Sequence, residues 1–219
     1  MSYSPIILIA GEPNSIFFEI FFKSLKKFNS KCPLVVIGSV KLLKLQMKKL
    51  KFQKEIRLLN IKKLNNYKLD NRLINLINID YNSDKAFETI TSKSNTYLKN
   101  SFEMAFKIIK KNKIKKFLTG PINKRTFLNK KFLGITEYIS KKFNKKKNGM
   151  LIYNEKLSVC PLTTHLPLKD VSRMISKNKI IEKVDLVDKF YKNILGISPK
   201  IAILGLNPHC ESVDKFNED

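Results

Sequence analysis

The sequence predicts an α/β fold in which helices flank a mostly parallel sheet. Short apolar runs of strand length alternate along the chain with longer stretches whose apolar residues recur at helical spacing. Polar turns containing glycine or proline follow several of the apolar runs. This alternation is typical of a parallel sheet, because the chain crosses over, usually through a helix, between one parallel strand and the next.

The first part of the chain repeats the pattern of strand, turn and helix. The apolar run IILIA ends in the turn GEP, and an amphipathic stretch follows it. A second apolar run, PLVVIG, precedes VKLLKLQMKKL, whose leucines and lysines fall on opposite sides of a helix. We therefore predict strands at 6–10, 33–38, 55–59 and 73–79, and helices at 16–28 and 40–50.

The middle of the chain predicts one long helix and then a strand. From Asp84 the pattern is helical, with Phe102 and Ile108 on one face and lysines on the other. The helix is expected to end near Asn112. Residues 114–118 are predicted to form a strand that runs directly into the turn TGP.

The last part of the chain predicts further strands around one more helical stretch. Asp170 is a candidate N-cap for a helical pattern that continues to Ile194, either as one helix or as two broken near Asn178. Gly196 is the expected C-cap. Three strands are predicted here, at 150–153, 157–162 and 200–206.

Length and composition indicate a globular protein of the cytoplasm. The chain has 219 residues, 43% of them hydrophobic, which is enough to bury a core, and we expect one α/β region over 1–219 without a firm internal boundary. No apolar run reaches the roughly 20 residues that cross a bilayer, and the N-terminus lacks secretory signal features. Cys32, Cys160 and Cys210 are scattered and odd in number, which matches a reducing compartment.

The net charge of +25 suggests a polyanionic partner, but the residue types weaken that interpretation. Nearly all of the positive charge is lysine, which is less suited than arginine to bidentate recognition of phosphates and bases. Lysine, asparagine and isoleucine are all abundant, as an AT-rich coding sequence would produce whatever the function. Nucleic-acid binding is therefore kept only as an alternative.

Four polar turns follow predicted buried strands, and together they form a candidate site. In open α/β sheets, ligands bind outside the carboxyl ends of the strands. The four turns are GEP at 11–13, TGP at 119–121, TTH at 163–165 and NPH at 207–209.

Two kinds of chemistry are suggested by the side chains of these turns. His165 and His209 are the only histidines, and both follow predicted strands, so they are candidate metal ligands or else ordinary loop histidines. A catalytic zinc normally takes three protein ligands, so the pair alone does not make a firm site. Thr119, Gly120 and Lys124 suggest anion binding, with an ordinary glycine turn beside a surface lysine as the alternative.

Taken together, these motifs and one more resemble a known family. The chain carries GEP near its N-terminus and GLNPH at 205–209. Between them stand TGPINK at 119–124, GITEY at 134–138 and TTHLPL at 163–168. In order and spacing, this set resembles the family of 4-hydroxythreonine-4-phosphate dehydrogenase over nearly the whole chain.

The resemblance implies a fold, a reaction and an assembly. The implied fold is similar to that of isocitrate and isopropylmalate dehydrogenases. The implied reaction is the NAD-dependent oxidation and decarboxylation of 4-phosphooxy-L-threonine to 3-amino-2-oxopropyl phosphate, a step of pyridoxal phosphate biosynthesis. It requires a divalent metal, for which zinc, cobalt and magnesium all remain open. The implied assembly is a homodimer with the active site at the subunit interface.

The resemblance also implies roles for particular residues. His165 and His209 match two of the three metal-binding histidines of the family. Thr136 matches the substrate-binding threonine of the family's GHTE motif. Lys124 matches the lysine that follows TGP, where with Thr119 and Gly120 it would contact the phosphate or carboxylate of the substrate. The resemblance assigns no catalytic or NAD-binding residue within this chain.

Three departures from the family pattern leave alternatives open. Ile135 replaces the histidine of GHTE and can neither hydrogen-bond nor titrate, and Asn14–Phe18 replaces a glycine-rich segment. The family's third metal histidine and its NAD-binding residues lie beyond NPH, so we expect this chain to be C-terminally incomplete. The alternatives are a truncated, inactive or metabolite-binding relative, and a basic nucleic-acid-binding protein. Related phosphorylated hydroxy acids also remain possible substrates.

Overall fold

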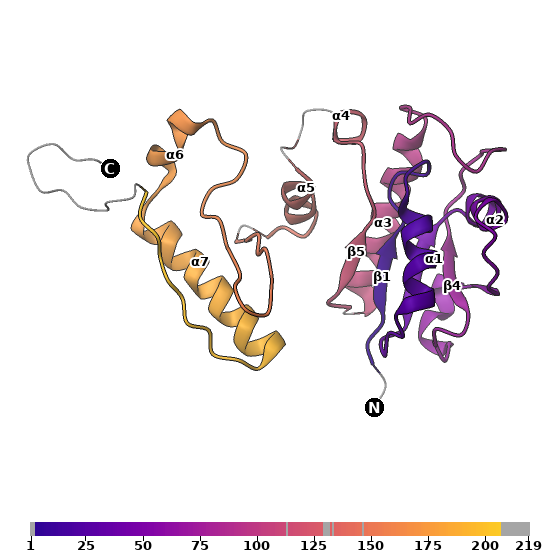
Figure 1. The fold of residues 1–219 in the computed structure, drawn as a ribbon, viewed down its shortest axis with the longest axis horizontal. Coiled ribbons are helices and arrows are strands. Elements are labelled where there is room, and N and C mark those ends of the chain that lie inside the picture. The colour runs from indigo at the N-terminus through magenta and orange to yellow at the C-terminus, as the bar shows by residue number, and fades with distance from the viewer. Residues whose placement is uncertain (1–2, 113, 129–131, 133, 146, 207–219) are drawn as a thin grey trace, which may run out of the picture. The chain divides into compact units, whose positions relative to one another are not determined.

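A computed structural model describes residues 3–112, 114–128, 132, 134–145 and 147–206 (Figure 1). The chain divides into two compact units, Met1–Phe132 and Leu133–Asp219, and each is described by itself. The expectation that residues 1–219 form a single α/β region stays a prediction. No helix in the described part of the chain is long and apolar enough to cross a membrane.

Unit 1 contains a parallel five-stranded sheet, which confirms the predicted α/β class. The strand order is β3-β4-β2-β1-β5, so β1 lies between β2 and β5, with Ile7 opposite both Val35 and Phe117. The strands span Ile6–Ile9 (β1), Leu34–Gly38 (β2), Ile56–Leu58 (β3), Ile74–Asn78 (β4) and Phe117–Thr119 (β5).

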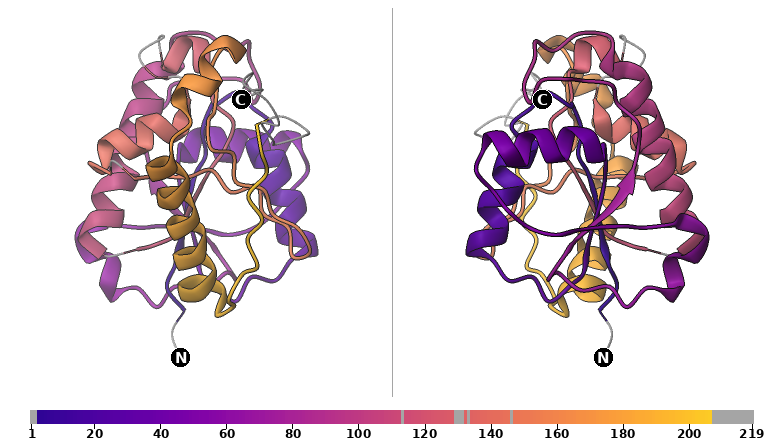
Figure 2. Two further views of the ribbon diagram at one scale, coloured as in Figure 1. Left: turned by 90° about the vertical axis from the view of Figure 1, so that its left-hand side faces the viewer. Right: turned by 90° about the vertical axis from the view of Figure 1, so that its right-hand side faces the viewer.

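Helices cover both faces of this sheet (Figure 2). The side chains of Leu8, Val36 and Leu76 point to one face and pack with buried residues of α1 and α2. Because side chains alternate along a strand, Ile7 and Val35 point to the other face, which α3 covers. The helices of unit 1 are α1 Phe17–Lys27, α2 Val40–Lys49, α3 Ser94–Asn112 and α4 Lys124–Phe127, with a 3-10 helix, η1, at Ile61–Asn66.

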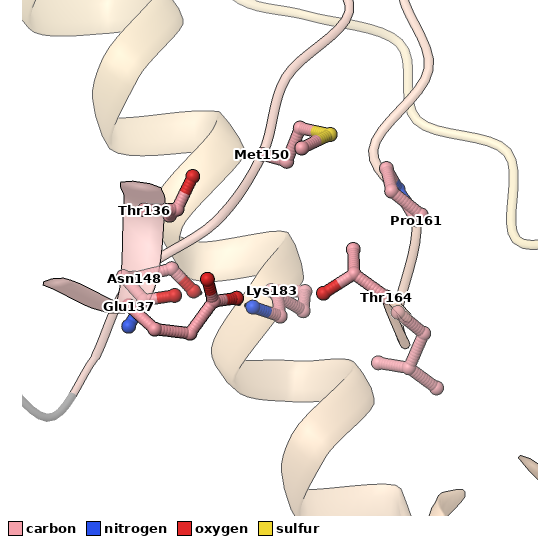
Figure 3. Close-up of a pocket in the computed structure, with 8 residues that line it drawn as sticks. Thr136, Glu137, Asn148, Met150, Pro161, Thr164 and Lys183 are labelled. Carbon is pink, nitrogen blue, oxygen red and sulfur yellow. Dashed lines mark hydrogen bonds between the residues drawn. The ribbon is translucent and has the colours of Figure 1, made fainter. Parts of the chain in front are cut away.

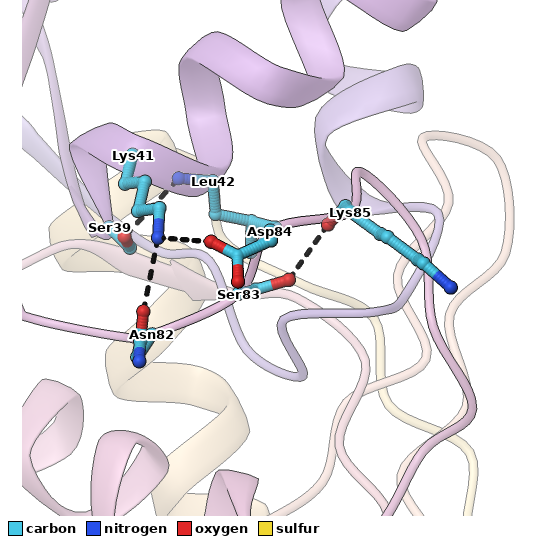
Figure 4. Close-up of polar contacts among 7 residues, drawn as sticks. All are labelled: Ser39, Lys41, Leu42, Asn82, Ser83, Asp84 and Lys85. Carbon is cyan, nitrogen blue, oxygen red and sulfur yellow. Dashed lines mark hydrogen bonds and ion pairs between the residues drawn. The ribbon is translucent and has the colours of Figure 1, made fainter.

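The long helix of unit 1 begins ten residues later than predicted, at Ser94 instead of Asp84. The start of the intervening segment is bound to α2 (Figure 4). Lys41, in the first turn of α2, donates hydrogen bonds to Asn82 Oδ1 at 3.0 Å and to Asp84 Oδ1 at 2.7 Å. These two contacts tie the start of the segment to α2.

Unit 2 consists of helices and irregular segments. Its helices are α5 Ile135–Lys142, α6 Leu168–Met174 and α7 Lys177–Phe190, followed by a π-helical turn, η2, at Tyr191–Leu195. The helical stretch is two helices broken at Ile175 and Ser176, which confirms the predicted alternative of a break near Asn178. The Ser176 side chain accepts from Lys179 N at the start of α7. Gly196 ends the stretch with φ +71°, as predicted for a C-cap.

Two predictions for unit 2 are wrong. Asp170 lies in the first turn of α6, whose N-cap is Pro167. The strands predicted at 150–153 and 157–162 are reduced to one antiparallel bridge between Ile152 and Val159, and 200–206 forms no strand. A strand requires a hydrogen-bonded neighbour, and in the described residues of unit 2 these apolar runs have little or none.

Candidate functional site

In unit 1 the loops after β1 and β5 meet, as expected for neighbouring parallel strands. Glu12 N donates to Pro121 O at 2.7 Å, and Gly120 N donates to Ile9 O at 2.8 Å. A Cβ at Gly120 would stand 2.3 Å from Ala10 O. The glycine is therefore required because the GEP and TGP loops pack backbone to backbone.

The anion-site candidates lie at this carboxyl edge of the sheet. Thr119 is the last residue of β5, and its exposed side chain bonds to the backbone oxygen of Gly120 at 3.1 Å. Lys124 is the first residue of α4 and is exposed. Thr119, Gly120 and Lys124 thus follow one another within six residues at this edge, and Ala10 and Phe17 already fill the space around Gly120.

Sequence reasoning did not single out Glu12, whose carboxyl group is buried at this edge of the sheet. Its side chain is only 2% exposed, and Ser94 Oγ donates to its Oε2 at 3.0 Å. Its other oxygen, Oε1, has no hydrogen-bond partner. Burial raises the pKa of Glu12 above its ordinary value, and the hydrogen bond from Ser94 acts in the opposite direction. An acidic residue two positions after a fully apolar run was the available signal.

Unit 2 contains a small cavity beside Thr136 that is lined by both polar and apolar side chains (Figure 3). It has a volume of about 30 Å³. Thr136 and Glu137 reach it from the first turn of α5, and Thr164 reaches it from the TTH loop. Lys183 enters from α7 and donates a hydrogen bond to the backbone carbonyl of Asn148. Neither Glu137 nor Lys183 was among the predicted site residues.

His165 lies next to this cavity and has an unusual backbone conformation. Its φ is +60°, in a region that residues other than glycine seldom adopt, and its side chain is exposed. A Cβ at Gly134 would stand 2.9 Å from Glu137 Oε2 and 3.8 Å from His165 Nε2. The fold therefore brings the GITEY and TTHLPL motifs together, although they are about 30 residues apart in the sequence.

Of the two predicted metal ligands, the described residues include only His165. Among them, no group of three or more His, Cys, Asp or Glu side chains could hold a metal ion. The exposed imidazole of His165 fits one ligand position. His209, the second predicted ligand, lies outside the described residues.

The GEP loop does not fit a dinucleotide cradle. A Cβ at Gly11 would stand 2.4 Å from Pro121 O, so the TGP loop occupies the space where a pyrophosphate would approach. The next segment continues into α1 with Phe17 and Phe18, whose rings pack together at 5.3 Å between centroids. No NAD-binding residue is assigned in this part of the chain.

Comparisons with known proteins agree on one family. The family described as pyridoxal phosphate biosynthetic protein PdxA matches residues 30–217. A 4-hydroxythreonine-4-phosphate dehydrogenase from a Sulfurihydrogenibium species is 36% identical over 209 residues, which are 93% of this chain and 63% of the relative. The enzyme of that name from Aquifex aeolicus is 33% identical, over 95% of this chain and 64% of the relative. This chain thus spans less than two thirds of the length of either relative.

A solved structure shows the same fold. The crystal structure of 4-hydroxythreonine-4-phosphate dehydrogenase from Klebsiella pneumoniae superposes with a TM-score of 0.79 at 23% identity. The match covers 94% of this chain and 65% of that one. At this identity the likeness concerns the fold alone.

Proposed function

The chain belongs to the family of the pyridoxal phosphate biosynthetic protein PdxA, and from this we propose that it serves the oxidation of 4-phosphooxy-L-threonine. The proposed reaction uses NAD and a divalent metal and ends, after decarboxylation, in 3-amino-2-oxopropyl phosphate. One observation supports it above the others. Thr136 and His165, which match the family's substrate and metal positions, come from separate motifs and lie around the same small region of unit 2.

The proposal gives each site residue a role. The Thr136 hydroxyl would bind the substrate, and Lys124 with the TGP loop would take its phosphate or carboxylate. His165 and His209 would hold the metal, which when bound would polarise the substrate hydroxyl and stabilise the enolate left by decarboxylation. We also propose a cytoplasmic homodimer whose interface completes the site, as the resemblance to the family implies.

An assay of NAD reduction tests this function. The purified chain would be mixed with 4-phosphooxy-L-threonine, NAD and zinc, cobalt or magnesium, and the absorbance of NADH followed. We expect metal-dependent turnover, and His165→Ala should lower it roughly 100-fold or more because a Lewis acid contributes several kcal/mol to the barrier. Lys169→Ala, an exposed change near the same loop, is the matched control. A folded protein that forms no NADH with any of the three metals would contradict the proposal.

A further inference from the structure

We propose that a pocket at the amino edge of the unit 1 sheet, where its strands begin, binds a small polyanion of the diphosphate class. The pocket has a volume of about 420 Å³, a size typical of sites for small organic ligands. Its lining residues are 29–31 and 33 before β2, 54 before β3, and 69–72 before β4. Because these strands are parallel, their starts share one edge, opposite the GEP and TGP loops. This pocket is therefore separate from the site of the proposed function.

The lining of the pocket is cationic. Lys31, Lys54 and Arg72 come from three separate segments, and Asp70 is the single carboxylate of the lining, which gives a net charge of +2. Asp70 is already paired, since Arg72 donates to it from the backbone N at 2.9 Å and from Nη2 at 3.0 Å. Within the described part of the chain, Lys31 and Lys54 have no ion pair. Cations gathered around one hollow in this way attract an anion.

Two of the four arginines of the chain lie at this pocket. Arg57 is held beside it, because its Nη1 donates to the backbone oxygen of Lys68 at 3.1 Å. The hydrogen bond from Arg72 and the charge of Arg57 lower the pKa of Asp70 below its ordinary value. A guanidinium has five N–H donors in a fork that matches phosphate, so both arginines keep donors to offer. A composition biased toward lysine does not explain two arginines at one pocket.

The walls of the pocket are fixed by one side chain. The Asn71 amide donates to the backbone oxygens of Ser30 at 2.8 Å and Cys32 at 2.9 Å. Its Oδ1 accepts from Leu34 N at 2.8 Å. These three hydrogen bonds join the segment before β4 to the segment before β2. A frame that is ordered before binding loses less conformational entropy when a ligand arrives.

The charge and the size of the pocket define the class of ligand. Cationic groups on separate segments favour a ligand with at least two anionic groups, because one anion cannot contact all of them closely. A pocket of this volume suits a small molecule better than the extended backbone of a nucleic acid. Inorganic pyrophosphate and the diphosphate of an organic molecule share the required chemistry. Pro33 and Leu69 offer an apolar wall to the organic part of the second kind.

Calorimetric titration of the full chain without divalent metal tests the site. The ligands are inorganic pyrophosphate, inorganic phosphate and adenosine diphosphate. Pyrophosphate should bind saturably and roughly tenfold or more tightly than phosphate. Arg72→Gln and Lys54→Gln should each weaken pyrophosphate binding roughly tenfold, because each removes a charge-assisted hydrogen bond. Adenosine diphosphate binding more tightly than pyrophosphate would identify an organic diphosphate as the ligand, and the reverse order would identify free diphosphate.

A matched control separates this pocket from the general charge of the chain. Lys99→Gln removes the same charge from an exposed position on α3 and should change the affinity by less than about twofold. Weakening as large as that of Arg72→Gln would overturn the inference. Arg72 is 86% exposed, so its replacement is expected to leave the fold intact, which circular dichroism would check.

Three further outcomes would also overturn the inference. The first is that folded wild type binds none of the three ligands saturably. The second is that Lys124→Gln abolishes binding while Arg72→Gln does not, which would place the anion at the TGP loop. The third is that a DNA duplex, compared at equal phosphate concentration, displaces pyrophosphate more effectively than adenosine diphosphate does, which would identify a nucleic acid as the occupant.

Discussion

The two units of this chain bury their apolar residues very differently. Nearly all of the fully buried hydrophobic side chains lie in unit 1, where Phe102, Ile7 and Leu42 are at 0% exposure. In the described part of unit 2, Tyr138 is the single hydrophobic residue classed as buried, whereas Leu204 is 88% exposed. A sheet covered on both faces by helices builds a closed core, and the described helices of unit 2 have no such sheet to cover. The residues proposed to bind metal nevertheless belong to unit 2.

The largest effect should come from opening the core of unit 1. Phe102→Ala removes a ring with no exposure and should lower the free energy of unfolding by about 3–5 kcal/mol, through lost burial and the cavity left behind. Ile203→Ala in unit 2, at 64% exposure, should change it by less than about 0.5 kcal/mol. Urea unfolding measures both. Similar losses would show that Ile203 is covered in solution and that the contrast between the units is not real.

A smaller difference in stability is expected between glycine substitutions in the two units, because Gly120 and Gly196 are glycines for different reasons. Gly120→Ala places a Cβ against the backbone of Ala10 and should cost about 1–3 kcal/mol, because backbone cannot move aside cheaply. Gly196 has open space but φ +71°, so Gly196→Asn should cost only a few tenths of a kcal/mol, since asparagine tolerates this conformation. Thermal unfolding compares the two. A tolerated Gly120→Ala would mean that the GEP and TGP loops are not packed as described.

The smallest effect is the pH dependence of stability that the buried carboxyl group of Glu12 contributes in unit 1. Burial raises the pKa of Glu12, so its contribution to stability is fully present below the ordinary value of 4.5 and is lost as pH rises through the raised pKa. Glu12→Gln cannot titrate. The unfolding free energy of wild type minus that of Glu12→Gln should therefore fall as pH rises above 4.5. Denaturant titrations over this range measure it, and a difference that stays constant or grows would contradict the burial of Glu12.

The sequence predicted the strands of unit 1 better than the structure of unit 2, and the reason is physical. In unit 1 the apolar runs at 6–10 and 33–38 became strands because each found a parallel neighbour, and the GEP and TGP loops met as predicted. In unit 2 the apolar run at 200–206 found no such neighbour in the described residues. The tendency of a sequence to form a strand depends on packing and pairing with neighbouring strands. An apolar run therefore becomes a strand only where the tertiary structure supplies a partner.

The sequence by itself determined the α/β class, the family and the motifs around Thr136 and His165, because these depend on local periodicity and on residue identity. Only the tertiary structure decided that Lys183 lies beside Thr136, since a helix some 45 residues away brings it there and an ordinary lysine pattern gives no sign of it. It also decided that Glu12 is buried and that Glu137 keeps an unpartnered oxygen. Burial and hydrogen-bond satisfaction depend on neighbours distant in the sequence, and only folding specifies them.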